Sequence, residues 1–364
     1  MPRPAVATID SRSDRDMPAL RDALDPPTMR KYLRRCLAAF GREPFQIRAI
    51  RLMRHKHGRR CVIEYELEFA GHSVTVLGKL RAKGLDRRTY RLYRKLWRSD
   101  LRSGGLDLPQ PLGALADLGM WLQRKVTGTP ATTLFGSPNA EVLAREIAVA
   151  AFRLHQAGPL PQRSHTAADE LAILQDRLAQ VALKRPRLEM RLGRLKAVCE
   201  RLAKSLPPID PQLIHRDFYG DHVLVADERL YLLDFDLCCQ GDPAVDVGNF
   251  VAHMSEQSLR EHGNAEALAA EEEALKERYV ELAGAAVRER IDIYAALTLA
   301  RHVHISTLIA ARRPYTEALL ELSLERAHAL ERQRSQPRPL VTRSATSSYT
   351  RSRQYNRYGG KEIR

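Results

Sequence analysis

Two aspartates that follow apolar, strand-like runs are the residues best suited to chemistry in this chain. Asp217 comes shortly after Leu213 and Ile214, and Asp234 directly follows residues 230–233. A turn at residues 226–229 joins two runs into a predicted hairpin, so we expect the two carboxylates to lie close together. One such acid can take the proton of a hydroxyl group, while the other holds a divalent metal on a polyphosphate. The pair therefore predicts phosphoryl transfer.

An antiparallel sheet is predicted ahead of this hairpin, over residues 45–126. Residues 61–69 alternate strictly, with apolar side chains on one side and three glutamates on the other, which is typical of a half-buried strand. Runs at 45–55, 73–81, 110–115 and 120–126 complete five strands, and a helix capped by Asp86 follows the third. Beyond a linker at 127–130 the periodicity is helical to residue 332, apart from a short β segment at 212–236. The predicted fold class is α+β.

Positive charge is concentrated in two zones. The chain of 364 residues has 59 Lys and Arg against 44 Asp and Glu, a net charge of +15. Residues 48–102 hold sixteen basic and five acidic residues, and residues 334–364 hold eight basic and one acidic. Such zones attract polyanions such as nucleotides, phosphorylated metabolites, nucleic acid or an anionic membrane, although a solvated basic face is the plain alternative.

The catalytic hairpin resembles the aminoglycoside and choline phosphotransferase branch of the protein-kinase-like fold. That branch carries H-G-D-x-x-x-x-N, then a hydrophobic residue with D-[WF]-[DE], then G-D-P-x-x-D. The corresponding segments here are 215–222, 233–236 and 241–246. The resemblance covers about residues 45–310 and implies a two-lobed kinase-like fold, with a small antiparallel β lobe and a large, mainly helical lobe.

The resemblance also implies roles for particular residues. Asp217 would be the catalytic base, Asp234 the main Mg²⁺ ligand, and Lys79 the group that meets the ATP phosphates. The other implied site residues are His215 and Arg216, which support the catalytic loop; Gly58 and Arg59, which cover the nucleotide phosphates; Leu122 and Gln123, in a hinge at 120–125 whose backbone pairs with adenine; and Asp246, which braces the loop. Asp236 is interpreted as a second acid of the metal site rather than as a surface residue.

Two positions depart from the family pattern. The metal-binding Asn of the family is His222 here. Mg²⁺ prefers oxygen ligands and an imidazole is a poorer match for it, so the site is expected to use Mg²⁺ or, as an alternative, Mn²⁺. The helix at 87–98 contains no Glu to pair with Lys79. These departures keep a second hypothesis open, a catalytically inactive nucleotide-binding pseudokinase module with a basic docking tail.

The first hypothesis is an ATP-dependent small-molecule kinase. It would move the γ-phosphoryl group to a hydroxyl of a sugar, amino alcohol or related metabolite. The cluster 271–273, three glutamates, could serve a cationic acceptor but is interpreted as a solvated helix face. His302 and His304 could face the acceptor pocket but are interpreted as satisfied interior histidines. The basic tail leaves contact with nucleic acid or an anionic surface open.

The expected organisation has four parts. They are a disordered leader (1–27), a nucleotide-binding lobe (28–126), a catalytic and acceptor-binding helical lobe (127–333) and a disordered basic tail (334–364). Neither a secretory signal nor an apolar run long enough to span a membrane is visible, and five scattered cysteines form no CxxC pair. We therefore expect a reduced, cytoplasmic protein.

Overall fold

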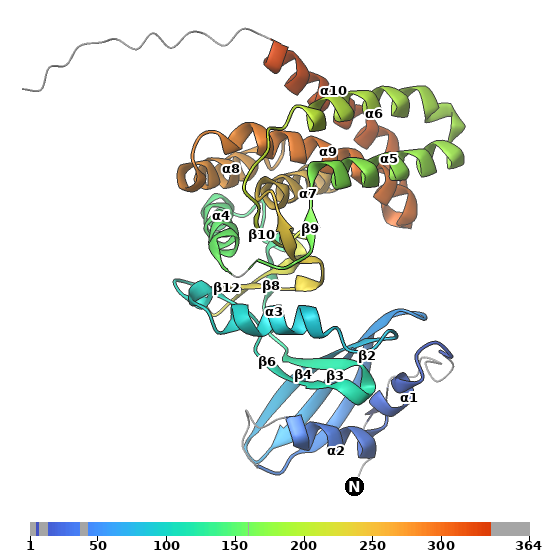
Figure 1. Ribbon diagram of the computed structural model, residues 1–364, viewed down its shortest axis with the longest axis vertical. Helices are drawn as coiled ribbons and strands as arrows, with labels where there is room; N and C mark the ends of the chain where they lie inside the picture. The colour runs from blue at the N-terminus through green and yellow to red at the C-terminus, as the bar shows by residue number, and fades with distance from the viewer. Residues whose placement is uncertain (1–4, 7–13, 37–42, 159, 336–364) are drawn as a thin grey trace, which may run out of the picture.

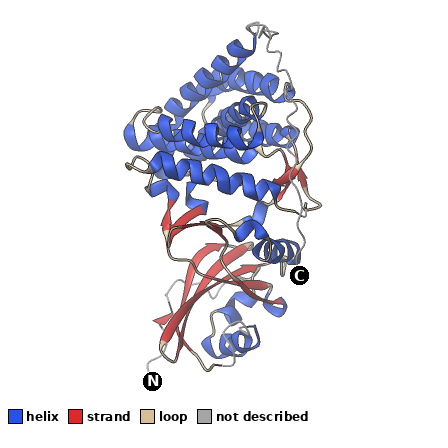
Figure 2. Cartoon of the chain, turned by 90° about the vertical axis from the view of Figure 1, so that its left-hand side faces the viewer, coloured by secondary structure: helices blue, strands red, loops and turns tan. Residues whose placement is uncertain are grey.

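The computed structural model describes residues 5–6, 14–36, 43–158 and 160–335. The chain forms two lobes, one built on a sheet and one built of helices (Figures 1 and 2). The predicted basic tail lies outside the described residues, apart from its first two positions. Within the described ranges, no helix combines the length and apolar character needed to cross a membrane.

The small lobe is a six-stranded sheet in the order β1-β2-β3-β4-β7-β6. Five strands are antiparallel, as predicted, and β1 adds a short parallel edge beside β2. Ile63, Tyr65 and Leu67 are fully buried on one face, which confirms the alternation of this strand. The strands are β1 (Ala5–Val6), β2 (Gln46–Lys56), β3 (Arg60–Phe69), β4 (His72–Arg81), β6 (Pro111–Leu115) and β7 (Met120–Arg124).

Two helices cover this buried face of the sheet. α1 (Ala19–Ala23) and α2 (Pro26–Cys36) place Leu20, Met29 and Leu33 in the same apolar cluster as the sheet residues. The Tyr65 hydroxyl also donates a hydrogen bond to the Ala23 carbonyl at 2.9 Å. The structure therefore differs from the expected leader. Residues 14–27 are ordered and partly buried because their apolar side chains cap the sheet, and the rest of the leader, apart from β1, lies outside the described residues.

α3 (Arg87–Trp97) connects the two lobes. Asp86 caps it, as predicted, by accepting a hydrogen bond from the Thr89 N–H at 3.0 Å. Tyr93 and Leu96 belong to the core of the large lobe rather than to the small-lobe cluster. The Tyr93 ring packs edge to face against the Phe235 ring, with 5.4 Å between their centroids. The helix therefore fixes the sheet relative to the catalytic hairpin.

In the described residues, the large lobe is a helical bundle with two small sheets, one of three strands and one of four. α7 packs against α9, and α4 packs against α8. Its helices are α4 (Ala140–Gln156), α5 (Ala167–Lys184), α6 (Glu189–Lys204), α7 (Ala244–His262), α8 (Ala269–Ala283), α9 (Val287–Leu308) and α10 (Thr316–Ser335). Its strands are β5 (Leu106–Asp107), β8 (Thr129–Pro130), β9 (Ser164–His165), β10 (Gln212–Ile214), β11 (Val223–Ala226), β12 (Arg229–Leu232) and β13 (Cys239–Gly241). The predicted hairpin is the β11–β12 pair, which β10 precedes.

His302 of α9 is a buried imidazole that should make the fold sensitive to acid. In the described part of the chain neither of its ring nitrogens has a hydrogen-bond partner, contrary to the expectation of a satisfied histidine, whereas His304 contacts Gln180 at 3.0 Å. Burial, with the nearby Arg301 and Arg312, lowers the pKa of His302 to about 3. The pKa of a free histidine is about 6.5. Below that pH the unfolded chain binds a proton at His302 that the folded chain does not bind, so the free energy of unfolding falls as the pH drops.

We expect His302→Leu to remove this acid sensitivity. Its free energy of unfolding, relative to that of the original chain, should rise by roughly 2 kcal/mol between pH 7 and pH 5. Urea unfolding at the two pH values measures this difference. An equal loss of stability in both proteins would contradict the assignment to His302.

Candidate active site

The predicted catalytic loop begins where β10 ends and is held by α7. The Asp246 carboxylate, wholly buried on α7, accepts hydrogen bonds from the backbone N–H groups of His215 and Arg216 at 2.6 and 2.7 Å. His155 of α4 reaches the same carboxylate at 3.0 Å and is itself bound to the Tyr279 hydroxyl at 2.7 Å. The loop is therefore fixed by a carboxylate whose own position is fixed from two further helices.

His215 joins the two loops that carry the aspartates. Its Nε2 lies 2.7 Å from the Leu233 carbonyl, which can only accept, so Nε2 carries the proton. Nδ1 is then free to accept from the Asp217 N–H at 3.3 Å. Burial lowers the pKa of His215, which keeps this neutral tautomer in place. One ring thereby sets the spacing between the Asp217 loop and the end of β12.

Both loops hold a non-glycine residue in the left-handed region. Arg216 has a φ of 67° and Asp234 a φ of 55°. This region costs an ordinary residue about 1–2 kcal/mol, and such strain gathers where surrounding contacts over-determine the backbone. For Arg216 those contacts are the Asp246 hydrogen bonds, and they aim the following Asp217 side chain away from the core, where it is 42% exposed.

The structure brings Asp217, His222 and Asp234 together. One ligand atom from each lies within 4.8 Å of the other two. His222 Nδ1 lies 2.7 Å from the Asp217 carbonyl oxygen, so that nitrogen holds the proton and Nε2 presents a lone pair, 4.0 Å from Asp234 Oδ2. Two carboxylates and one oriented imidazole fit a divalent cation of the Mg²⁺ or Mn²⁺ kind.

Lys79 of β4 pairs with Asp234 across the two lobes. Its Nζ lies 3.2 Å from Asp234 Oδ1 and 5.2 Å from the centre of the Trp121 ring. Burial raises the pKa of the Asp234 carboxyl, but Lys79 and His222 outweigh burial and hold that pKa well below its usual range. Asp234 is therefore ionised at every pH of interest, and it takes the place of the helix Glu that the sequence lacks.

Asp236 differs from its expected place in the metal site. Its Oδ2 accepts from Arg60 of β3 and from Arg81 of β4, both at 2.7 Å, and its carboxylate is not part of the Asp217 group. Arg60 begins β3 and Arg81 ends β4, and Lys79 Nζ also lies 3.7 Å from Asp236 Oδ1, so three cations of the small lobe surround this carboxylate. In this structure Asp236 is an ion-pair link between the lobes.

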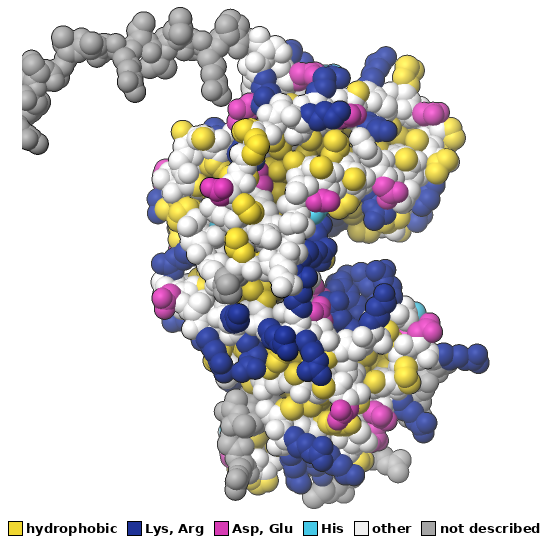
Figure 3. Space-filling model, viewed as in Figure 1, with side chains coloured by type: hydrophobic (Ala, Val, Ile, Leu, Met, Phe, Trp, Pro, Cys, Tyr) yellow, Lys and Arg dark blue, Asp and Glu magenta, His cyan; other side chains and the backbone are white. Residues whose placement is uncertain are grey.

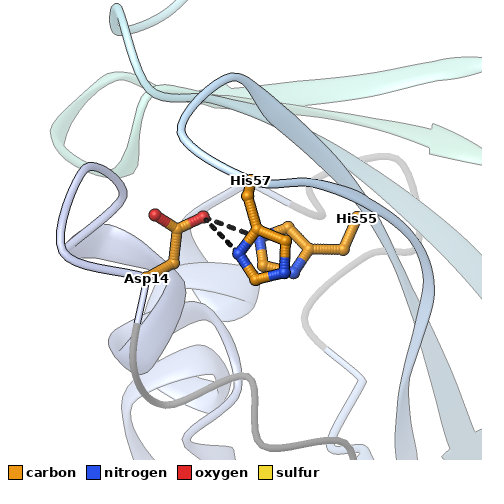
Figure 4. A group of neighbouring side chains, drawn as sticks. All are labelled: Asp14, His55 and His57. Carbon is orange, nitrogen blue, oxygen red and sulfur yellow. Dashed lines mark hydrogen bonds and ion pairs between the residues drawn. The ribbon is translucent and has the colours of Figure 1, made fainter.

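The turn before β3 is held by the N-terminal segment. Gly58 has a φ of 61°, which favours glycine, and its N–H donates to Asp14 Oδ2 at 3.0 Å. The same oxygen lies 2.7 Å from His55 Nε2 and 3.8 Å from His57 Nδ1 (Figure 4). The Gly58 N–H, expected to cover nucleotide phosphates, is thus already bonded to a carboxylate, whereas Arg59 projects from the turn into a cleft.

The structure places Leu122 and Gln123, which are expected in the hinge, inside the small-lobe sheet. Both lie in β7, between β4 and β6, so their backbone groups are paired within the sheet. Leu122 points into the cluster beneath α1 and α2, away from the large lobe. The predicted hinge at 120–125 therefore overlaps β7 (Met120–Arg124) almost completely.

Sequence reasoning missed several supporting residues. Asn249, one helical turn after Asp246, donates to the Phe218 carbonyl at 2.9 Å, and Arg301 fixes that Asn at 2.8 Å. The D-x-x-N spacing of Asp246 and Asn249 on α7 was the only sequence signal for Asn249.

The 271–273 cluster also differs from the expected solvated face. Glu271 and Glu272 are buried, the first bonded to the Gly136 N–H at 3.0 Å, because α8 packs inward on α4.

The chain belongs to the phosphotransferase enzyme family, whose sequence pattern matches residues 81–297. This match confirms the predicted family and the predicted class of enzyme, a small-molecule kinase. Among the curated proteins, none matches the chain.

Solved structures show the same kinase-like fold. A spectinomycin phosphotransferase in complex with ADP and spectinomycin is 13% identical, with a TM-score of 0.57 over 84% of this chain and 98% of that one. A putative aminoglycoside phosphotransferase from Ralstonia eutropha is 14% identical, with a TM-score of 0.56 over 84% and 98%. A choline/ethanolamine kinase family protein from Mesorhizobium loti is 17% identical, with a TM-score of 0.50 over 84% and 99%.

His222 should determine which metal the site prefers. An imidazole suits Mn²⁺ better than Mg²⁺, which favours oxygen ligands. We expect His222→Asn to lower the ratio of kcat/KM with Mn²⁺ to that with Mg²⁺ by about tenfold, the usual scale for a changed metal surrounding. The exposed His72, changed to Asn, is the matched control and should leave the ratio unchanged. An unchanged ratio in His222→Asn would remove His222 from the metal site.

Proposed function

We propose that this protein is an ATP-dependent kinase that transfers the γ-phosphoryl group to a hydroxyl of a small molecule, such as a sugar, an amino alcohol or a related metabolite. The observation that carries the proposal is the convergence of Asp217, His222 and Asp234 beside Lys79. ADP in a similar structure supports a nucleotide in this site. The proposal keeps 28–126 as the nucleotide-binding lobe and 127–333 as the catalytic lobe.

In the proposed mechanism, the carboxylates divide the work. Asp217 accepts the proton of the acceptor hydroxyl and orients its oxygen, because it is the more exposed of the two and can reach a bound substrate. Asp234, together with His222, would hold Mg²⁺ or Mn²⁺, which when bound neutralises phosphate charge. Lys79 would turn from Asp234 to the phosphates of ATP. His215 and Asp246 keep the two loops at a fixed spacing, so positioning supplies much of the rate.

Release of ADP across a panel of hydroxyl compounds tests this function. The panel should contain cationic, neutral and anionic acceptors, each with Mg²⁺ and with Mn²⁺. We expect at least one acceptor to raise ADP release far above the rate with ATP alone, and mass spectrometry should find a phosphate added to it. Saturable ATP binding without transfer to any acceptor would instead support the inactive nucleotide-binding module.

A further inference from the structure

A basic cleft runs along α3 between the two lobes. Its volume is about 1150 Å³. Dark blue side chains gather at the notch between the lobes and recur over the adjacent face of the small lobe (Figure 3). The cationic residues that line the cleft are Lys56, Arg59, Arg60, Arg81, Lys83, Arg87, Arg88, Arg91, Arg94, Lys95, Arg98 and Arg163. The acids among its lining residues are Asp86 and Asp236.

Most of these cations are not neutralised by the protein. Both acids of the cleft already bind Arg81, and Asp236 also binds Arg60. Among the described residues, no carboxylate pairs with any of the other ten lining cations. The large lobe behaves differently, since its surface cations are widely paired, as in Arg145 with Glu281 at 3.0 Å and Arg326 with Glu266 at 3.0 Å. The excess charge is therefore a local property of the cleft.

The cations at the start of α3 are placed against the preference of a helix, whereas Arg94 and Lys95 lie in its last turn, where cations are favoured. Arg87 and Arg88 occupy its first turn, where the helix dipole favours acids, and no acid lies there. Arg87, Arg91, Arg94 and Arg98 then follow at spacings of three and four, and like charges at these spacings repel. These arginines are exposed, and Arg94 lies over the half-buried Tyr90 ring, 5.6 Å from its centre. Exposed residues that repel one another along a helix oppose local stability, which is a signal of function.

The cleft also continues into the proposed phosphate site. Arg60, Arg81 and Asp236 line both this cleft and a smaller adjoining cavity, and that cavity is also lined by Lys79 and Asp234. From Arg87 to Arg98 the helix advances about 16 Å, so one triphosphate cannot contact the whole row. Arg163 faces the row from the large lobe, which makes the site a two-walled cleft for a compact molecule rather than an open surface.

We propose that this cleft selects the acceptor, and that the acceptor is a compact polyanion, a small hydroxyl compound that carries two or more phosphate or carboxylate groups. This inference rests on the proposed kinase function and narrows its substrate class. Guanidinium groups bind phosphate and carboxylate in bidentate fashion, and several of them in a cleft exclude a cationic acceptor. The anionic groups would lie along α3, with the acceptor hydroxyl directed toward Asp217.

Charge reversal on α3 tests the proposal. Arg91→Glu/Arg94→Glu should fold normally, because the new acids relieve repulsion along the helix. The matched control is Arg30→Glu/Arg34→Glu on α2, which changes the net charge equally on exposed arginines at the far side of the sheet. Inositol hexakisphosphate serves as the probe, and titrations contain saturating AMP-PNP and Mg²⁺ so that the nucleotide site is filled. We expect the α3 variant to bind the probe about tenfold or more weakly, and the control to match the original chain.

Three outcomes of the titration would overturn the proposal. They are no binding of the probe, equal weakening of binding in both variants, and displacement of the probe by a single-stranded DNA oligonucleotide at a lower concentration than that of the probe itself.

The acceptor panel separates this inference from the kinase function. If neutral or cationic compounds are phosphorylated and the α3 variant turns them over normally, the kinase function stands and the polyanion proposal fails. If polyanions are phosphorylated and their KM rises about tenfold in the α3 variant only, both stand. If the probe binds as expected but no acceptor is phosphorylated, the kinase function fails, and with it the role of the cleft in acceptor selection.

Discussion

Asp217→Asn should lower kcat by about 10³-fold while the affinity for ATP stays within a few-fold of the original value. General acid–base groups contribute roughly 10²–10⁴-fold, and Asn keeps the shape of the side chain but cannot take a proton. Asp217 is 42% exposed, so its replacement should leave the free energy of unfolding nearly unchanged. The measurement is steady-state turnover with the best acceptor of the panel, alongside ATP titration and urea unfolding.

Asp221→Asn is the matched control for this experiment. It lies four residues further along the same loop, is exposed, and is not part of the group formed by Asp217, His222 and Asp234. We expect its kcat to stay within a few-fold of the original value. Comparable turnover in the two variants would refute the role of Asp217 in proton transfer.

The second large effect is expected at Asp234. Asp234→Asn removes the charge that faces both Lys79 and His222, at 3.2 and 4.0 Å. A neutral amide is a poor ligand beside a cation, so the affinity for ATP should no longer increase on addition of Mg²⁺, and kcat should fall by at least about 10²-fold. Isothermal titration of ATP with and without Mg²⁺ measures the first effect directly.

Asp236→Asn distinguishes a metal ligand from a link between lobes. Its carboxylate is bonded to Arg60 and Arg81, so the variant should retain the Mg²⁺-dependent gain in ATP affinity. Loss of this gain in Asp236→Asn but not in Asp234→Asn would reverse the assignment and restore Asp236 as the metal residue.

The sequence predicted most of the fold because its signals are local. Strict alternation in residues 61–69 identified β3, and Asp86 before a run of helical spacing identified the start of α3. The catalytic hairpin was predicted because an unbroken motif carries Asp217, His222 and Asp234 within eighteen residues. In the structure the ligand atoms of these three residues form one close group, and Asp14, His55 and His57 form a second one elsewhere.

What the sequence could not predict depends on contacts between distant segments. The hydrogen bond from the Gly58 N–H to Asp14 spans 44 positions of the sequence, and the ion pair of Arg60 with Asp236 spans 176. Neither pair has a periodicity of its own, so Asp236 was placed by its nearness to Asp234 in the sequence. The burial of Glu271 and Glu272 escaped prediction for the same reason, since an acidic run looks solvated until the helix beneath it is known.

A crystal structure with Mg²⁺ and AMP-PNP is the most direct test of the proposed site. We predict a metal ion in contact with Asp234 and His222, the terminal phosphate beside Lys79, and the Asp217 carboxylate facing that phosphate across the space for a hydroxyl. A nucleotide bound with its phosphates directed away from the β11–β12 hairpin, or a metal ion that contacts neither Asp234 nor His222, would contradict the account.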